Sequence, residues 1–266
     1  MATVAGTAPA RAASPGLTRR LDLWPTLTSF AVLVGGWELL GQALQQPFFP
    51  PLSSVLKELG DNQKEIVAAL GTSLQNFALG YLFSIVFGVG LGLLMGGFRR
   101  LDAALDIYVN ALLTAPSLVF APIFFAIWGL ERWSIVAVIF MYSTWIIVVN
   151  TVTAVRTVSV ELIEMGQAFG APTARMWTRI VLPAAVPLIM AGVKLATGRA
   201  VKGMLNGEMF IAIVGLGKLV KDGSGRFDAS LVLAVLVVII VVSFVAVWAV
   251  NWVDARLTRW VPKTSR

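Results

Sequence analysis

Charged side chains inside an apolar segment are the first sign of chemistry in this sequence. Lys194, Arg199, Lys202 and Glu208 all fall within the otherwise mostly apolar range 184–214. A charge in a membrane-spanning helix is costly unless it is paired or hydrated, so such residues mark ion or solute paths. At about 100° per residue, the four side chains cover about half of a helix circumference. One carboxylate cannot neutralise three cations, and the excess positive charge favours an anionic solute.

A purely structural role for these charges is the alternative. Arg199 or Lys202 can pair with Glu208, or with Glu38 of the first apolar segment, and the pair would then offer nothing to a solute. The residue types and their spacing leave both interpretations open. Whether these charges are paired or hydrated depends on which other segments pack against residues 184–214.

The composition places the chain in the membrane class. Its 266 residues are 58% hydrophobic and only 13% charged, and the mean hydropathy is +0.83, whereas soluble domains carry about 25% charged residues. The sequence has no Cys and no His, which excludes disulfides and thiolate metal sites and removes the usual general base. The stretches GVGLG and GLGKL lack the spacing of nucleotide-binding motifs. We therefore expect no metal or ATP site on this chain and no enzymatic activity.

Six apolar segments are long enough to span a membrane, which takes about 20 helical residues. We expect an all-α integral membrane protein with the spans Trp24–Leu44, Ile66–Gly96, Ile107–Trp128, Trp133–Val155, Ala184–Val214 and Ala229–Val253. If the N-terminus is cytoplasmic, that side holds twelve Lys and Arg residues, against six on the other side. Cytoplasmic flanks of spans collect these cations, so both termini are expected in the cytoplasm.

The expected organisation is a six-span domain, residues 23–255, between two cytoplasmic tails. Residues 1–22 are rich in Ala, Pro and Ser and are expected to be disordered, and residues 256–266 form the second tail. The first apolar run is too long for the core of a signal peptide, so it is expected to remain as a span.

The segments between the spans and the glycines within them carry further predictions. PPLSSVLKELGDNQKEI predicts a short surface helix, whereas the Gly-rich GLGKLVKDGSGRFD predicts a loop. Gly88, Gly92 and Gly96 recur every four residues, which brings them to one helix face where another helix can approach closely. Packing inside the bundle is favoured over a dimer contact.

Residues 164–183, EMGQAFGAPTARMWTRIVLP, interrupt the apolar pattern. The spacing of Met165 and Phe169 predicts a short amphipathic helix, which Gly170 can end in the left-handed conformation. A second helix restarts at Pro172, which a first turn tolerates. Physical chemistry alone favours a helix–turn–helix that lies in the membrane interface as a connector.

The same segment resembles the cytoplasmic EAA loop of ABC-importer permeases. The residues that match at the spacing of that loop are Glu164, Gly170, Ile180, Leu182 and Pro183. Met165 and Gly166 replace its two alanines. The stretches TAPSLVFAPIFFAIWGL, VVNTVTAVRTVSVELIE and GVKLATGRA…GEMF look like the subfamily that imports sulfonates, taurine, nitrate or related small solutes, and the likeness covers about residues 45–255.

This resemblance implies a type I importer of the bacterial inner membrane. A second permease copy would complete a homodimer, two ABC ATPase subunits would bind ATP and Mg²⁺ beneath it, and an extracytoplasmic solute-binding protein would deliver the solute. This chain itself would bind no cofactor. The EAA segment, about residues 158–180, would be the coupling helix seated in a cleft of the ATPase. The coupling residues on this interpretation are Glu164, Phe169, Gly170, Arg175, Met176 and Trp177.

The predicted function is thus that of a permease that imports a small anionic solute by alternating access. The predicted solute path contains Lys194, Arg199, Lys202, Asn206 and Glu208. Lys202 and Asn206 stand where the subfamily is expected to have apolar residues, so the solute preference can differ. The alternative is an ion-coupled secondary transporter, for which Glu38 and Glu208 are the available coupling acids.

Overall fold

The computed structural model describes residues 23–44, 46–211 and 213–260, and every regular element within these ranges is a helix. Five helices are long and apolar enough to cross a membrane, and a bent helix pair raises the number to six if it counts as one span. The five are α1 (Leu23–Leu44), α3 (Gln63–Gly97), α6 (Arg132–Arg156), the continuous segment Thr173–Ile211 that contains α9, and α11 (Ala229–Leu257). The predicted all-α membrane fold is confirmed, with five to six candidate spans.

The tails predicted from the sequence fall mostly outside this description. Residues 1–22 and 261–266 lie outside the described residues. Helix α11 continues to Leu257. The boundary expected at residue 256 therefore falls in the last turn of a helix.

The third predicted span is wrong as a single helix. It is replaced by α4 (Arg99–Thr114), the 3₁₀ turn η1 (Ser117–Phe120) and α5 (Ala121–Trp128). The two halves meet at 97°. The break has a local cause, because Ala115 precedes Pro116 and is extended, with ψ 140°. Proline disfavours the helical region for the residue before it and cannot donate a backbone hydrogen bond itself.

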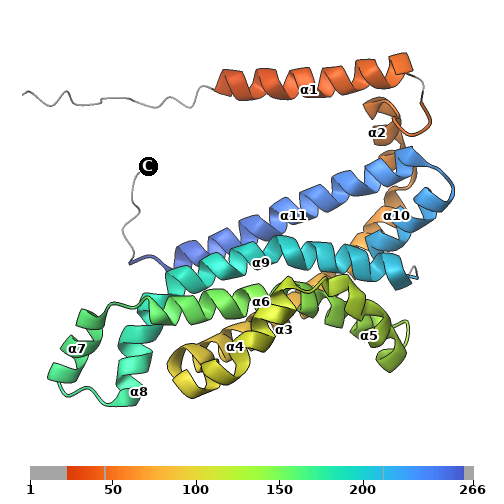
Figure 1. Cartoon of the computed structure of the whole chain (residues 1–266). Helices are drawn as coiled ribbons and strands as arrows, with labels where there is room; N and C mark the ends of the chain where they lie inside the picture. Colours follow the sequence, from red (N-terminus) through yellow and green to blue (C-terminus); the bar gives the residue numbers. More distant parts are fainter. Residues whose placement is uncertain (1–22, 45, 212, 261–266) are drawn as a thin grey trace, which may run out of the picture.

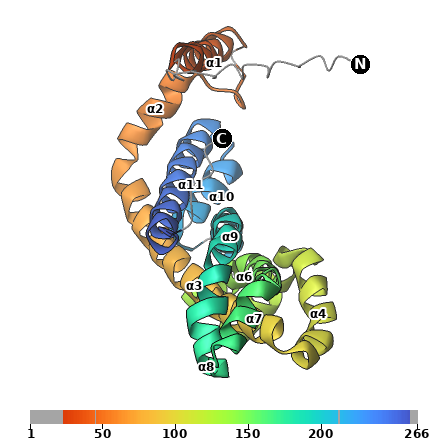
Figure 2. The same cartoon turned by 90° about the vertical axis from the view of Figure 1, so that its left-hand side faces the viewer.

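Helix α6 lies at the centre of the bundle, with α3 on one side and α9 (Leu182–Ile211) on the other (Figures 1 and 2). The small residues of α3 that face α6 are Gly80, Ser84, Gly88, Gly92 and Gly96. A β-carbon added at Gly92 would lie 2.5 Å from Cβ of Thr151. Only glycine permits this approach, so the predicted packing role of the glycine repeat is confirmed.

Helix α2 (Leu52–Asp61) confirms the predicted short surface helix. It forms an elbow with α1, in which Cα of Pro51 lies 2.5 Å from where a β-carbon on Gly41 would stand. Glu38 accepts hydrogen bonds from the backbone N of Ser53 at 2.9 Å and from its Oγ at 2.8 Å. This elbow holds α1 away from the other spanning helices, as Figures 1 and 2 show.

Residues 215–225 form helix α10 (Gly215–Gly225), so the loop predicted there is wrong. Burial explains the difference, because Leu216, Leu219 and Val220 recur at helical spacing and pack into the core. Gly217 is needed for close approach rather than for a flexible loop. A β-carbon on Gly217 would lie 2.7 Å from the carbonyl oxygen of Leu205.

Candidate functional site

The EAA-like segment folds into two helical arms, which we call the hairpin. Its first arm is α7 (Val160–Ala168), and its second begins with α8 (Thr173–Met176). Gly170 has φ 67°, so the predicted left-handed end of the first arm is confirmed. The second arm runs through a π-helical turn, Trp177–Val181, directly into α9. The second arm of the hairpin and the fifth predicted span are therefore one continuous helix, Thr173–Ile211.

Small and flexible side chains join the two arms of the hairpin. Gly166 is buried, and a β-carbon there would lie 2.6 Å from Cδ1 of Ile180 and 2.8 Å from Cε of Met176. The ring of Trp177 packs on Gly97, where a β-carbon would stand 2.5 Å from it. Met176 and Trp177 thus contact their own chain, Met176 between the arms and Trp177 at the end of α3.

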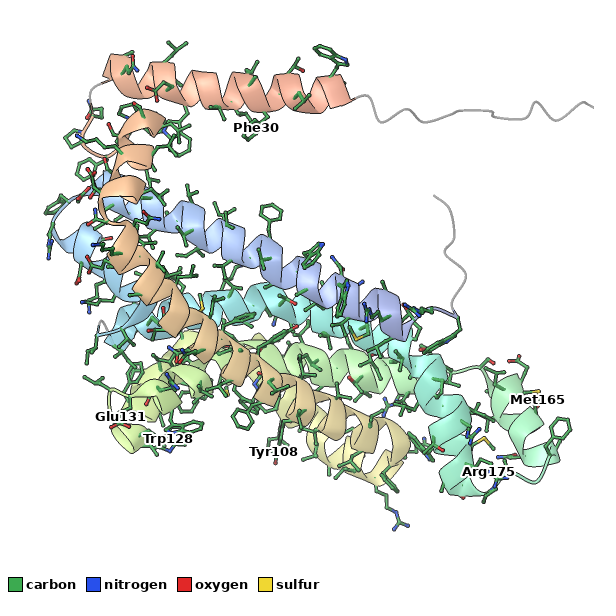
Figure 3. All side chains as sticks on the ribbon, turned by 180° about the vertical axis from the view of Figure 1, so that it is seen from behind. Phe30, Tyr108, Trp128, Glu131, Met165 and Arg175 are labelled. Carbon is green, nitrogen blue, oxygen red and sulfur yellow. The ribbon has the colours of Figure 1, made fainter. Side chains whose placement is uncertain are left out.

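The outer surface of the hairpin carries the remaining predicted coupling residues. Phe169 is 85% exposed at the tip, beside the half-exposed Met165. Glu164 and Arg175 are exposed as well, and Figure 3 shows Met165 and Arg175 at the end of the molecule that the hairpin forms. An apolar tip with flanking charges is available to another protein.

The structure separates the charged residues of α9. Lys194 donates to Oδ2 of Asp254 on α11 at 2.5 Å. Glu208 is fully buried and faces α3 and α10, where it accepts hydrogen bonds from Ser73 Oγ at 2.7 Å, Asn76 Nδ2 at 3.2 Å and Gly217 N at 3.1 Å.

The structural alternative, in which Arg199 or Lys202 pairs with Glu208 or Glu38, is not found in the described part of the chain. Within the described residues, the ion pairs involve neither Arg199 nor Lys202. Glu208 lies nine positions after Arg199, which is about 180° around the helix. Glu38 is occupied at the elbow by Ser53.

One face of α9 brings together Arg199, Lys202 and Asn206, and Arg199 and Lys202 are exposed on it. Asn206 Nδ2 donates to Oη of Tyr142 on α6 at 2.8 Å. We call these four residues the polar stripe. The sequence did not predict a role for Tyr142, because its only connection to the site is the hydrogen bond to Asn206, 64 residues away. Lys194 and Glu208 do not belong to this face.

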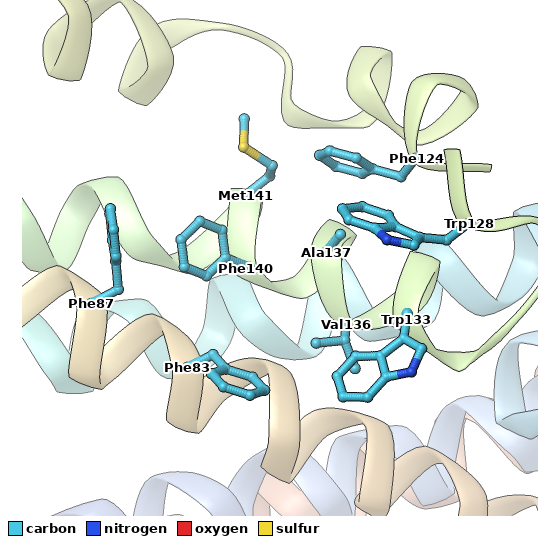
Figure 4. Close-up of a pocket in the computed structure, with 9 residues that line it drawn as sticks. All are labelled: Phe83, Phe87, Phe124, Trp128, Trp133, Val136, Ala137, Phe140 and Met141. Atoms are coloured by element: carbon cyan, nitrogen blue, oxygen red, sulfur yellow. The ribbon is translucent and has the colours of Figure 1, made fainter. Parts of the chain in front are cut away.

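A separate cavity of about 450 Å³ lies between α3, α5 and α6 (Figure 4). Its lining is apolar and largely aromatic, and it consists of Phe83, Phe87, Phe124, Trp128, Trp133, Val136, Ala137, Phe140 and Met141. Because its lining has no charged or amide side chain, this cavity is a poorer site for an anion than the face of α9 that carries Arg199 and Lys202.

Residues 84–259 match the family described as "Binding-protein-dependent transport system inner membrane component". The chain belongs to this family. It is an ABC transporter permease, a non-catalytic, multi-pass subunit of the inner membrane. ATP hydrolysis belongs to a separate subunit, and the family implies a solute-binding protein as the other partner.

The permease is similar to a probable ABC transporter permease protein of Brucella melitensis, with 28% identity over 245 residues, 91% of this chain and 99% of that one. It is also 28% identical to the nitrate import permease protein NrtB of Leptolyngbya laminosa, over 80% of each chain. A chain of the inward-facing MetNI methionine ABC transporter has the same fold, with a TM-score of 0.64 at 18% identity. That match covers 74% of this chain and 98% of the other.

Proposed function

We propose that this permease imports a small anionic solute along the polar stripe of α9. The observation that carries the proposal is the exposure of Arg199 and Lys202 on a spanning helix, with no ion pair to either within the described residues. Two unpaired cations facing lipid would be very costly, so they face water instead. Their net positive charge attracts an anion, and Asn206 and Tyr142 add hydrogen-bonding groups.

A second copy of the chain would complete the path. In the single chain Arg199 and Lys202 are exposed on the surface, and no described segment covers them. In a homodimer, two such stripes would enclose a water-filled route and keep the cations away from lipid. Both termini and the hairpin would face the cytoplasm, which the Lys and Arg asymmetry supports.

Coupling to ATP hydrolysis would act through the hairpin. The exposed Phe169 and Met165 would insert into the ATPase, with Glu164 and Arg175 as polar contacts around them. Because the second arm continues into α9, displacement of the hairpin moves the helix that bears the polar stripe. Alternating access would follow from this movement. Met176 would position the arms rather than touch the ATPase.

Uptake by proteoliposomes that contain the permease, its ATPase and its solute-binding protein tests the solute path. Radiolabelled nitrate and methanesulfonate are suitable anionic probes. Arg199→Gln and Lys202→Gln should each reduce uptake about tenfold or more, since each removes a charge that faces the anion. Arg259→Gln, in the exposed turn that follows α11, is the matched control. Unchanged uptake in both stripe variants, or transport of neutral solutes alone, would contradict the proposal.

The ion-coupled secondary transporter is not supported. Membership of the permease family implies a separate ATPase as the energy source. The two acids available for ion coupling are also both engaged, Glu38 at the elbow and Glu208 in the core.

A further inference from the structure

A polar cavity of about 420 Å³ opens beside the turn between α3 and α4. We call it the basic cavity, and its lining residues are Gly96, Gly97, Arg99, Asp102, Ala103 and Arg156. Neither the solute path nor the hairpin contacts proposed above use these side chains.

The charges around the basic cavity do not balance. Arg156 contacts Asp102 through a single pair of atoms, Nη2 and Oδ2, and its side chain remains 48% exposed. Guanidinium carries five N–H donors, so Arg156 keeps donors free for a second acceptor. Arg99 is exposed and has no ion pair within the described residues. Two arginines against one carboxylate leave the cavity with a net positive charge.

The basic cavity lies at the hairpin end of the bundle. The two glycines that line it are both packed against other elements: Gly96 contacts Val155 of α6, and Gly97 contacts the ring of Trp177. Gly96 and Gly97 are the last residues of the long spanning helix α3. The cavity therefore sits where a spanning helix leaves the hydrocarbon, at the level of lipid headgroups.

An apolar surface continues from the cavity along α4. Ala103 and Ile107 follow Arg99 at intervals of four residues, on one side of the helix, and Ile107 is 71% exposed. Tyr108 beside it is also exposed and points outward in Figure 3. Two acids also lie on this side of α4: Asp102 pairs with Arg156, and Asp106 accepts a hydrogen bond from Asn110 Nδ2 at 2.9 Å. A positive site followed by an apolar surface has the polarity of a phospholipid.

We propose that the basic cavity binds the phosphate group of an anionic phospholipid of the cytoplasmic leaflet. Arg99 and Arg156 contact the phosphate, and the acyl chains lie along α4. Basic pockets at the cytoplasmic ends of spanning helices are suited to such headgroups. The assignment of the leaflet rests on the orientation in the proposed function. The bound lipid would brace the turn after α3, on which Trp177 of the hairpin packs.

The test measures lipid binding to the full-length permease complex, purified in detergent, by native mass spectrometry. The probes are phosphatidylglycerol, phosphatidylcholine and inorganic phosphate. We expect preferential retention of phosphatidylglycerol and about fivefold weaker binding in Arg99→Gln, the contribution of one arginine near an anionic surface. Asp102→Asn should bind more tightly, because it removes the competing carboxylate. Arg259→Gln should bind like the wild type.

Three results would overturn the proposal. They are equal retention of phosphatidylcholine, equal loss of binding in Arg259→Gln and Arg99→Gln, and inorganic phosphate competing as well as the lipid at the same concentration. Melting curves without added lipid show that each variant is folded. The measurement needs no solute, ATP or transport, so its failure is distinguishable from failure of the proposed solute path.

Discussion

Replacing Glu208 by alanine should destabilise the permease strongly. The carboxylate is fully buried and accepts three hydrogen bonds, from Ser73, Asn76 and Gly217. A buried donor that loses its acceptor costs about 1–3 kcal/mol. Ser73 can turn its hydroxyl elsewhere, so the three costs do not add fully. Asn76 and Gly217 would each keep a buried N–H group without its acceptor, so a loss of about 2–6 kcal/mol is expected for Glu208→Ala.

Glu208→Gln should be much milder. Glutamine keeps the volume of the side chain and one acceptor oxygen. Asn76 now donates to Glu208 through Nδ2, and its Oδ1 is buried with no hydrogen-bond partner among the described residues, so a rotated Asn76 amide could accept from the new N–H group. A loss of about 1 kcal/mol is therefore expected. Since 1 kcal/mol shifts the melting temperature of a chain of this size by about 2–4 °C, alanine should lower it by about 10 °C and glutamine by only a few degrees.

Thermal melting of the purified protein in detergent measures both variants. Glu161→Ala, which removes an exposed carboxylate on α7, is the matched control and should melt like the wild type. Unchanged melting of Glu208→Ala combined with lost transport would refute the reasoning. That result would return Glu208 to the solute path, where the sequence alone had suggested it.

Three further predictions concern other contacts. Gly92→Leu should lower the free energy of unfolding by about 1–3 kcal/mol, because the new side chain meets Thr151, whereas Gly90→Leu on the open side of α3 should not; melting curves compare them. Phe169→Ala should leave melting unchanged but weaken co-purification of the ATPase about tenfold or more, and full retention would argue against its role at the tip. Lys194→Gln and Asp254→Asn should couple by about 0.5–3 kcal/mol in a double-mutant cycle followed by melting, and additive effects would mean that the ion pair contributes nothing.

The spanning helices were largely predictable because each coincides with a long apolar run of the sequence. Helix α11 begins at Ala229, where the uncharged run begins, and α6 spans 132–156 around the predicted 133–155. The bend after α4 and the fold of residues 215–225 were not predicted. Residues 107–128 are apolar enough to predict one span, although Pro116 interrupts the helix. In residues 215–225 the many glycines predict a loop, whereas the buried Leu216, Leu219 and Val220 form the apolar face of a helix.

The candidate site was predictable in type more than in arrangement. Helical spacing put Arg199 and Lys202 near one another, and the structure adds Tyr142 from α6. It also removes Lys194 from the stripe, since Asp254, sixty residues later, is its partner. Whether a charged residue of α9 is paired depends on side chains from distant segments, and the local sequence does not show which side chains those are.

The elbow between α1 and α2 has a consequence for how the protein is built. The main contacts of α1 are with α2, its immediate neighbour in the sequence, so the helix contributes little to the order of the bundle. Because α1 is held mainly by α2, its loss would leave the contacts among α3, α6, α9 and α11 in place. The later helices can therefore pack around α6 whether or not α1 is in place.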